Sequence, residues 1–272
     1  MALPRHFRAD QRIVSLAPSV TSILVAIGAR RRLVAVTRWC HAVTDVRGLP
    51  ELGDAWAIET GALARVRPTL IIGSVPYRPE TLAKLLEWPA PFVATNPRTI
   101  ADIFTEIRLL GALAGCTAGA ARLIRRMQGD FRQVDRLARR ARTRPRVYAE
   151  AWPHPRISSP PWVAELVEMA GGKMVVAAGC RLTDAAVRQA RPEVILLAWT
   201  AAGERSQPAQ LLRNSAWQSV PAVRTGRVVA VPDHWLNTPG PPLVKGLRLL
   251  FRLLHPELAS LLGRRHGKAG QR

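Results

Sequence analysis

The same short pattern occurs twice in this chain, 124 residues apart. The two copies are Ala62-Leu63-x-x-x-Arg67-Pro68-x-Leu70-Ile71-Ile72 and Ala186-Val187-x-x-x-Arg191-Pro192-x-Val194-Ile195-Leu196. Each copy predicts the end of a helix, a proline that stops it, and an apolar run short enough to be a buried strand. A helix followed by a buried strand is half of a βαβ unit. The repeat therefore predicts two similar α/β lobes with a cleft between them.

Strand and helix patterns alternate along the rest of the chain. Apolar runs typical of strands begin near Ile13, Leu33, Leu70, Phe92, Val147, Val194 and Val228, with a weaker one at Val175. Helical spacing of apolar residues covers 21–27, 79–88, 162–170 and 243–254. This order predicts an α/β fold of two Rossmann-like lobes, each with a mostly parallel sheet covered by helices.

The middle of the chain has a different pattern. Between residues 100 and 142 we find no convincing strand, and Gly115 or Gly119 at most interrupts a helical pattern. One face of this pattern is apolar and arginines occupy the other. The apolar positions are Ala120, Leu123, Ile124, Met127, Phe131, Val134, Leu137 and Ala138. A helix over 117–142 would be ~39 Å long and would join the two lobes as a stiff connector, or would lie on the surface of one continuous domain.

These patterns predict four parts of the chain. We expect an N-terminal α/β lobe over 1–98, a helical connector over 99–144 that includes the single long helix, a C-terminal α/β lobe over 145–262, and a disordered basic tail over 263–272.

Composition excludes several classes of protein. No apolar run approaches the roughly 18 to 20 residues of a membrane span. The first ten residues lack the apolar stretch of a secretory signal, so the chain as written predicts a cytoplasmic protein, and a periplasmic or cell-surface one if translation starts upstream. The three cysteines, Cys40, Cys116 and Cys180, are too few and too far apart for a disulfide framework or a zinc cluster.

The formal net charge is +21, carried almost wholly by arginine. Ten arginines lie between Arg122 and Arg146, against the acids Asp130 and Asp135. Such a charge is compatible with binding to nucleic acid or an anionic membrane, but no nucleic-acid-binding motif accompanies it. We interpret the arginines as a solvated helix face and do not expect nucleic acid as a partner.

Aromatic residues gather where predicted strands end. Ligands bind beyond the carboxyl ends of parallel strands, and rigid rings there suit a large, flat, partly apolar ligand. The alternative is that each ring closes the core at the end of an element. The candidate ligand contacts are Trp39, Trp56, Tyr77, Trp152, Trp199 and Trp235, with their neighbours Cys40, His41 and Arg78 and with Pro18 and Ser19 after the first strand.

The sequence contains none of the common catalytic or metal-binding motifs. The chain has no Gly-x-Ser-x-Gly elbow, no Walker loop and no His-Glu-x-x-His helix. His41 is adjacent to Cys40, and adjacent residues seldom face one ion. We therefore expect no catalytic residue, no resident metal and no cofactor.

Two acids precede the repeated helices at nearly matching positions, Glu59 nine residues before Pro68 and Asp184 eight before Pro192. An acid at a helix start interacts favourably with the helix dipole. The alternative is that this pair of charges, one on each lobe, docks on the arginines of a partner.

Several stretches together resemble the ABC-transporter substrate-binding proteins for vitamin B12 and ferric siderophores. The resemblance covers about residues 12–255 and is carried by Arg12-Ile13-Val14-Ser15-Leu16-Ala17-Pro18-Ser19-Val20-Thr21, by Gly28, by Leu33-Val34-Ala35-Val36-Thr37, by both Arg-Pro copies, and by Trp162-Val163-x-Glu165-Leu166-Val167-x-x-Ala170-Gly171-Gly172. It is strongest for the cobalamin-binding branch. It implies two α/β lobes joined by one long helix, with the ligand held between them.

The resemblance also implies site residues. Trp39 matches an aromatic that lines the cleft in the family, and Trp56 lies within one position of another. A second-lobe tryptophan is replaced by Gly179, so Trp152, Trp199 or Trp235 would have to substitute for it. Glu59 and Asp184 lie near the family's permease-docking acids.

These observations together predict a monomeric, non-enzymatic protein that binds a corrinoid similar to cobalamin. It would be the substrate-binding component of an ABC uptake system, or derived from one, with a permease as a possible partner. The alternatives are a protein that binds a ferric siderophore or haem, and a basic interaction protein that contacts nucleic acid or an anionic membrane.

Overall fold

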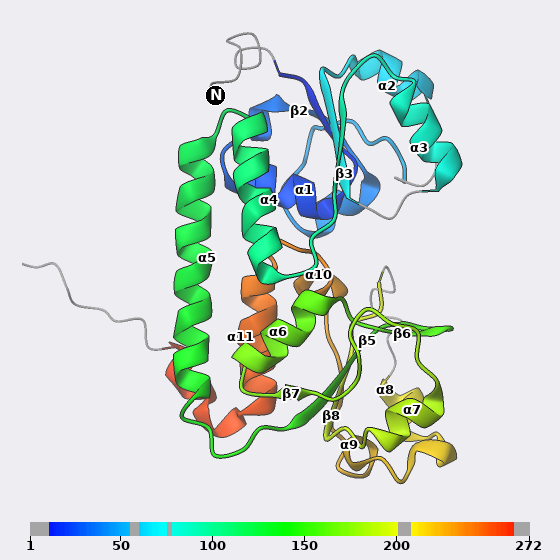
Figure 1. The fold of residues 1–272 in the computed structure, drawn as a ribbon, viewed down its shortest axis with the longest axis vertical. Helices are drawn as coiled ribbons and strands as arrows, with labels where there is room; N and C mark the ends of the chain where they lie inside the picture. Colours follow the sequence, from blue (N-terminus) through cyan, green and yellow to red (C-terminus); the bar gives the residue numbers. More distant parts are fainter. Residues whose placement is uncertain (1–10, 55–59, 75–77, 201–207, 264–272) are drawn as a thin grey trace, which may run out of the picture. The chain divides into compact units, whose positions relative to one another are not determined.

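The computed structural model describes residues 11–54, 60–74, 78–200 and 208–263. The chain forms two compact units (Figure 1). Unit 1 consists of Met1–Arg126 with Thr238–Pro241, and unit 2 of Met127–Asn237 with Pro242–Arg272. The division falls inside the long helix α5 (Thr117–Ala138), so the predicted connector over 99–144 is shared between the units. The predicted basic tail lies almost wholly outside the described residues.

Unit 1 contains a four-stranded parallel sheet of order β2-β1-β3-β4. Its strands are β1 (Ile13–Ser15), β2 (Leu33–Val36), β3 (Leu70–Ser74) and β4 (Phe92–Thr95). Its helices are α1 (Pro18–Ala26), α2 (Thr60–Val66), α3 (Pro79–Leu86) and α4 (Ile100–Leu113), with short 3-10 turns η2 (Arg30–Arg32) and η3 (Arg38–Ala42). Helices α1 and α4 cover one face of the sheet, and α2 and α3 cover the other (Figure 1).

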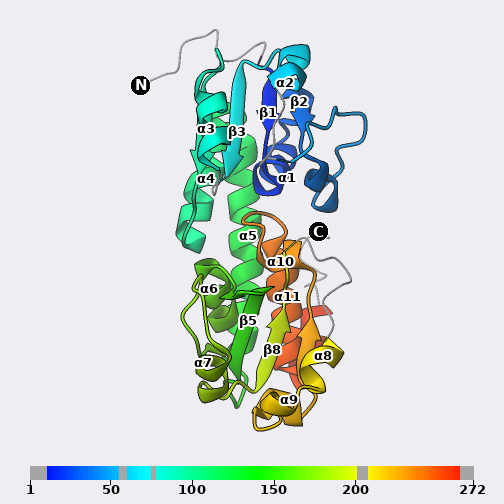
Figure 2. The same ribbon diagram turned by 90° about the vertical axis from the view of Figure 1, so that its right-hand side faces the viewer.

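Unit 2 contains a five-stranded sheet in which β5 pairs with three strands. The strands are β5 (Arg146–Pro153), β6 (Arg156–Ser158), β7 (Lys173–Met174), β8 (Val194–Leu197) and β9 (Val228–Ala230). All pairs are parallel except β5 with β6, and Figure 2 shows β5 and β8 side by side. The helical segments are α6 (Pro161–Met169), α7 (Asp184–Gln189), α8 (Pro208–Leu212), η5 (Ser215–Trp217), α9 (Pro221–Arg224), α10 (Asp233–Leu236), α11 (Leu243–Leu254) and η6 (Pro256–Gly263).

Both copies of the repeated pattern adopt the predicted structure. Helix α2 ends at Val66 and Arg67 follows it with φ of 41°, whereas α7 ends at Gln189 and Arg191, two residues later, has φ of 43°. The proline and the buried strand follow, β3 in one unit and β8 in the other. Because proline cannot continue the helix and the next residues are apolar, the same local rules produce the same turn twice. The prediction of a duplicated α/β frame with mostly parallel sheets is confirmed.

The long helix has the predicted amphipathic character. Ala120, Leu123, Ile124, Met127, Phe131, Val134 and Ala138 are buried, and the arginines between them are exposed. The helix ends at Ala138, four residues earlier than predicted. Gly115, with φ of 58°, separates α4 from α5. Gly119 lies within α5, where a Cβ atom would come within 2.0 Å of the Ile27 carbonyl oxygen.

Two elements of the sheet in unit 2 differ from the prediction. The weak strand placed at Val175 is the two-residue β7, which ends at Met174. The antiparallel strand β6 was not predicted, because its three residues are too few to show a period. None of the helices in the described ranges is long and apolar enough to cross a membrane.

Candidate functional site

In unit 1 the candidate contacts lie after the carboxyl ends of β1 and β2. Pro18 begins α1 and is half-buried, and Ser19 beside it is buried. Trp39, Cys40 and His41 form the centre of η3, directly after β2. The sequence expectation that these residues follow parallel strands is met in space, since β1 and β2 are neighbours in the sheet.

Trp39 presents an aromatic surface that is held in place at its edge. Its side chain is 40% exposed, and its indole Nε1 donates to Asp54 Oδ1 over 2.6 Å. The guanidinium carbon of Arg38 lies 4.9 Å from the ring centroid, and Arg38 Nε donates to the same Asp54 oxygen over 2.8 Å. The ring is thus fixed by Asp54 and leaves surface available for stacking. Sequence reasoning missed Asp54, because nothing in its neighbourhood links it to Trp39.

Cys40 belongs to the interior of unit 1. The thiol accepts a hydrogen bond from Thr21 Oγ1 at 3.0 Å and lies 3.3 Å from Thr37 Oγ1. Burial raises the pKa of the Cys40 thiol above its usual value. A buried neutral thiol is chemically unreactive. Cys40 is therefore a packing residue at the end of the sheet and not a contact for a ligand.

His41 is exposed and lies at a wide hollow of about 520 Å³ formed by the loop after η3. The rest of the lining is Thr44, Asp45, Val46, Arg47, Gly48, Leu49 and Glu51. Hydrogen bonds from Arg47 hold the pKa of Asp45 well below its usual value, and the two side chains form an exposed ion pair at 2.8 Å. The hollow does not include Trp39 or Cys40.

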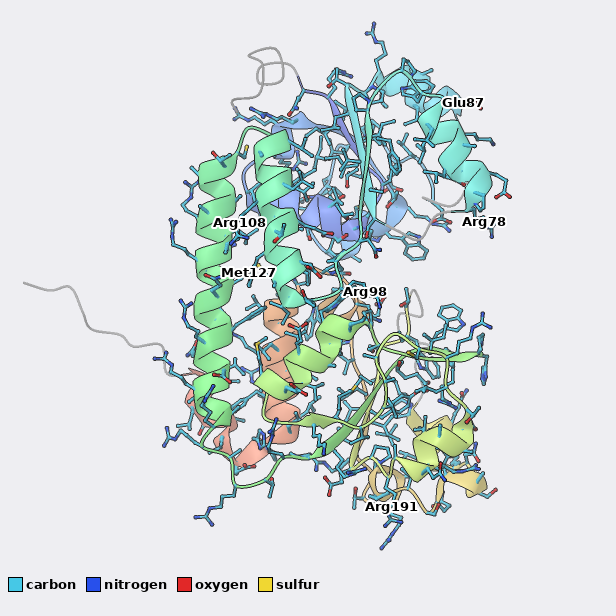
Figure 3. The ribbon with its side chains drawn as sticks, in the orientation of Figure 1. Arg78, Glu87, Arg98, Arg108, Met127 and Arg191 are labelled. Carbon is cyan, nitrogen blue, oxygen red and sulfur yellow. The ribbon has the colours of Figure 1, made fainter. Side chains whose placement is uncertain are left out.

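The remaining candidates in unit 1 are only partly described. Arg78 is exposed and lies at the beginning of α3, as Figure 3 shows. Trp56, Glu59 and Tyr77 lie outside the described residues. Their predicted roles stay predictions.

In unit 2 the central feature is Glu150, a fully buried carboxylate on β5. Tyr148 OH donates to its Oε2 over 2.6 Å, and Trp199 Nε1 donates to its Oε1 over 2.8 Å. Arg156, from β6, forms a salt bridge with Oε2. Three donors converging on one acid form the hydrogen-bond pattern of a carboxylate, which only accepts.

Arg156 links this buried acid to the start of α7. Its Nε donates to Asp184 Oδ1 over 2.9 Å, and its guanidinium carbon lies 4.7 Å from the ring centroid of Trp217. Trp217 Nε1 also donates to Asp184, over 3.3 Å. We call Tyr148, Glu150, Arg156, Asp184, Trp199 and Trp217 the charged network.

The pKa values in the charged network follow from burial and from these contacts. Burial raises the pKa of Tyr148, and the charge of Glu150 raises it further. Burial alone would lower the pKa of Arg156, but the charge of Glu150 and the hydrogen bond to Asp184 outweigh it and raise that pKa. Burial alone would raise the pKa of Asp184, but the hydrogen bond from Arg156, the charge of Arg156, the hydrogen bond from Trp217 and the charge of Arg188 together lower it.

A cavity of about 110 Å³ adjoins the charged network. Its lining comes from the β5–β6 hairpin, the end of β8, and the segment of α8 and the turn after it. The lining residues are Glu150, Pro153, His154, Arg156, Leu197, Trp199, Gln210, Leu211 and Asn214. Of the ring residues predicted for this unit, only Trp199 belongs to the lining.

The other predicted rings of unit 2 are not part of the cavity lining. Trp152 is 43% exposed and donates from Nε1 to the carbonyl oxygen of His154 at 2.9 Å. Trp235 is half-buried on α10, with its centroid 6.0 Å from that of His234 and 6.0 Å from Lys245 Nζ. Asp184 has a half-exposed side chain, at 50%, in the first turn of α7. Its predicted docking role stays a prediction.

Trp199 and Asp184 were candidates from the sequence, but the other members of the charged network, Glu150 above all, were missed. One signal was present, since an acid inside a strand as apolar as β5 is rare unless it is paired. Its partner could not be identified, because Arg156 is one of many arginines and β6 was not recognised. Among the residues that the structure describes, no group of three or more His, Cys, Asp or Glu side chains is arranged to hold a metal ion.

Known proteins resemble this chain over most of its length. A family model described as periplasmic binding protein matches residues 13–234. The ABC transporter substrate-binding lipoprotein YvrC of Bacillus subtilis (strain 168) is 22% identical over 91% of this chain and 81% of its own length. The vitamin B12-binding protein of Pectobacterium atrosepticum is 24% identical over 86% of this chain and 85% of its own length.

A solved structure has the same fold. It is the apo form of the periplasmic haem-binding protein RhuT from Roseiflexus sp. RS-1, which superposes with a TM-score of 0.78 at 24% sequence identity. The alignment covers 92% of this chain and 100% of that one. At this level of identity the likeness shows the fold, and it confirms the two-lobed α/β architecture predicted from the repeat.

Proposed function

Because the chain belongs to the periplasmic binding protein family, whose members are ligand-binding components of transport systems, we propose that its own ligand is a corrinoid similar to cobalamin. The family resemblance predicted from the sequence is thereby confirmed, and with it the role of a substrate-binding component of an ABC uptake system. The identity of the ligand is the proposal.

The observation that carries the proposal is the Trp39 ring. It is 40% exposed, it follows the carboxyl end of a parallel strand, and Asp54 fixes its edge at 2.6 Å. An immobilised indole supplies a flat apolar surface at little cost in conformational entropy, which suits stacking on a corrin ring. The vitamin B12-binding relative, 24% identical over 86% of the chain, supports the same ligand class.

Haem is the second candidate, and a specific observation favours it. The structure of similar fold described above is of a haem-binding protein, and haem is also a large flat ring. A ferric siderophore remains the third ligand class that the resemblance implies. The three ligand classes differ in their polar groups and in their absorbance spectra, so binding experiments can distinguish them.

The proposed setting follows from the relatives. YvrC is a lipoprotein and RhuT is periplasmic, which favours the second of the two locations considered from the sequence, outside the inner membrane. The partner would be an ABC permease. We include Asp184, half-exposed at the start of α7, and Glu59 as docking acids in this proposal.

Titration with cyanocobalamin tests the proposal. We expect saturable quenching of tryptophan fluorescence together with a shift of the corrin absorbance, and a parallel titration with haemin compares the second candidate. Trp39→Ala should weaken cyanocobalamin binding by about 1 to 3 kcal/mol without unfolding the chain. Trp39→Phe is the matched control, because it keeps an aromatic ring for stacking, although a smaller one, and loses the indole N–H that donates to Asp54.

Two results would count against this function. Absence of any spectral change at high micromolar cyanocobalamin removes the corrinoid. An unchanged dissociation constant for Trp39→Ala excludes that ring from the site.

A further inference from the structure

We propose that the arginines on the unit 2 part of α5, and on the residues just after it, form a docking surface for the anionic headgroups of a lipid bilayer. The inference goes beyond the ligand proposed above and takes from that proposal only the setting outside the inner membrane. It gives a role to side chains that the sequence assigned to a solvated helix face. The six exposed arginines that we call the arginine face are Arg132, Arg136, Arg139, Arg140, Arg142 and Arg144.

The arginine face follows one side of the helix. Arg132, Arg136 and Arg140 are four positions apart, about one turn each, so they form a row of roughly 12 Å. The row continues past the last residue of α5, because Arg140 N donates to the Leu137 carbonyl oxygen at 3.0 Å. The other side of this stretch is buried, at Met127, Phe131, Val134 and Ala138. Figure 1 shows this part of α5 at the edge of unit 2, away from α7, α8 and α9.

Acidic side chains do little to balance this face. Asp130 pairs with Arg248 of α11 at 2.6 Å, and Asp135 pairs with Arg139 at 3.0 Å. Over residues 127–144, six arginines against these two aspartates leave a net charge of +4. Within the described part of the chain, four side chains of the face form no hydrogen bond or ion pair, namely Arg132, Arg136, Arg140 and Arg142. These guanidinium groups are therefore available to an external anion.

The chemistry of the face matches phosphate. A guanidinium group can donate two parallel hydrogen bonds to a phosphate and keeps its positive charge at physiological pH. Among the residues that the structure describes, the exposed large apolar side chains all lie outside 127–144. Stacking on unpaired bases, insertion into a bilayer core and the centre of most protein interfaces all rely on such side chains. A surface that is rich in phosphate and is contacted through charge alone therefore fits the face best.

Lipid headgroups and nucleic acids both present phosphodiesters, and the setting favours lipid. Outside the inner membrane, the anionic phosphodiesters nearest to a substrate-binding protein are those of the bilayer. A cluster of about four to eight basic side chains on an amphipathic helix is typical of binding to anionic headgroups. The apolar side of α5 belongs to the protein core, so the helix would lie on the headgroups and not among the acyl chains. Binding of this kind is reversible and sensitive to salt.

Co-sedimentation of the full chain with lipid vesicles tests the inference. One set of vesicles contains equal parts of phosphatidylglycerol and phosphatidylcholine, and the other contains phosphatidylcholine alone. At about 0.1 M salt, where the Debye length is about 10 Å, we expect the native chain to sediment with the anionic vesicles only. At about 1 M salt, where the Debye length is about 3 Å, we expect the chain to be released.

Two variants that lose the same charge separate the face from the net charge of +21. The face variant combines Arg132→Gln, Arg136→Gln, Arg140→Gln and Arg142→Gln. The control variant replaces exposed arginines elsewhere in unit 2 and combines Arg181→Gln, Arg191→Gln, Arg213→Gln and Arg224→Gln. Figure 3 shows Arg191 well away from α5.

The face variant should bind the anionic vesicles about 30-fold or more weakly, because each basic side chain near an anionic surface contributes roughly fivefold. The control variant should lose at most about threefold, because charges far from the bilayer are screened. The replaced side chains are exposed, so the urea midpoints of both variants should stay close to that of the native chain. If the face variant does not fold, the lipid and salt dependence of the native chain still decides.

Absence of binding to the anionic vesicles by the native chain overturns the inference, and so does equal binding to phosphatidylcholine alone. Equal losses in the two variants would assign the attraction to the net charge and overturn it as well. Duplex DNA at the same phosphate concentration is the competitor, and release of the chain from the vesicles by this DNA would reassign the face to nucleic acid. The cyanocobalamin titration contains no vesicles, so the ligand proposal and this inference fail separately.

Discussion

The two units share the order and direction of four strands, and they differ at the carboxyl ends of their central strands. In unit 1 the strand order is β2-β1-β3-β4, and in unit 2 the order β7-β5-β8-β9 repeats it. The equivalent registers are Ile13 opposite Leu70 and Val147 opposite Val194.

The same hydrogen-bond arrangement connects the start of each central strand to the end of the repeated helix. Arg12 donates to the carbonyl oxygens of Val66 and Arg67 at 2.8 and 3.1 Å. Arg146 donates to those of Ala190 and Arg191 at 2.6 and 3.3 Å. In both units an arginine at the start of the central strand, just before β1 and as the first residue of β5, donates to carbonyl groups left unpaired by the end of the helix. The two copies of the sequence repeat therefore also form equivalent hydrogen bonds.

The carboxyl ends of the central strands differ. In unit 1, Thr21 Oγ1 lies 2.7 Å from Ser15 Oγ and 3.0 Å from the Cys40 sulfur, so neutral polar groups close the space. In unit 2, β5 runs on for eight residues and pairs with β6, which delivers Arg156 to Glu150. A buried ion pair is weak evidence for stability, because desolvation offsets its attraction. The two units therefore share their sheet, and the buried ion pair of unit 2 comes from its additional hairpin.

Removing the cation of the charged network should have the largest effect. Arg156→Met leaves Glu150 buried without its ionic partner and should lower the free energy of unfolding by about 3 to 5 kcal/mol. In unit 1, Thr21→Val removes only neutral hydrogen bonds and should cost about 1 kcal/mol. Urea unfolding measures both.

A double variant tests the cause of that difference. Arg156→Met with Glu150→Gln should recover much of the loss, because no buried charge remains. Similar costs for Arg156→Met and Thr21→Val would show that the two ends are energetically alike.

Close helix packing should respond equally in the two units. A Cβ atom on Gly119 would lie 2.0 Å from the Ile27 oxygen, and one on Gly246 would lie 2.1 Å from the Trp235 oxygen. Gly119→Ala and Gly246→Ala should each destabilise the chain by about 1 to 3 kcal/mol, because backbone must move. Gly129→Ala in α5 meets nothing within 4 Å and should stabilise by up to about 1 kcal/mol. Thermal unfolding that ranks Gly129→Ala with the other two would refute the packing argument.

The duplicated arginines offer a finer comparison. Arg12→Met and Arg146→Met should each lower the free energy of unfolding by about 1 to 2 kcal/mol, through the loss of charged hydrogen bonds to helix carbonyls. The effect should be larger for Arg146, because it is half-buried and Arg12 is exposed. Denaturant midpoints that fall for one variant and not for the other would show that the two turns are not equivalent in energy.

The pH dependence of stability should have opposite signs for two acids in different units. Burial raises the pKa of Glu106 in unit 1 to about 7, so the folded state keeps a proton that the unfolded chain has released. Its contribution to stability therefore falls as pH rises from about 4.5 to about 7 and is constant above that. The lowered pKa of Asp184 acts in the other direction, and its contribution is lost as pH falls through the acid range.

Glu106→Gln should make the loss of stability between low and high pH smaller by about 1 kcal/mol. This value is smaller than the full pKa shift would give, because the side chain is only partly buried and solvent screens its charge. Urea midpoints at pH 5 and pH 8.5 measure it, with the exposed Glu87→Gln as the control. A decline in Glu106→Gln as steep as in the native chain would contradict the assignment.

The frame was predictable from the sequence because its determinants are local. Apolar runs at Ile13, Leu70 and Val194 and prolines after each repeated helix depend on neighbours along the chain. The charged network was not predictable, because its groups come from β5, β6, the residues after β8, the start of α7 and η5, and they meet only in the folded state. Trp39 was identified as a ring at the end of a strand. Its fixation by Asp54 depends on the path of a loop, which the sequence pattern does not specify.

The position of the division within α5 has a consequence for how such a protein can be recombined. A crossover between Arg126 and Met127 would join two half-helices whose apolar residues come from different parents, although those residues pack as one stripe. Thr238–Pro241 also belongs to unit 1, so a chimera should not have a breakpoint within this segment. Functional chimeras of this chain with its relatives should therefore inherit α5 whole, with breakpoints before Thr117 or after Ala138.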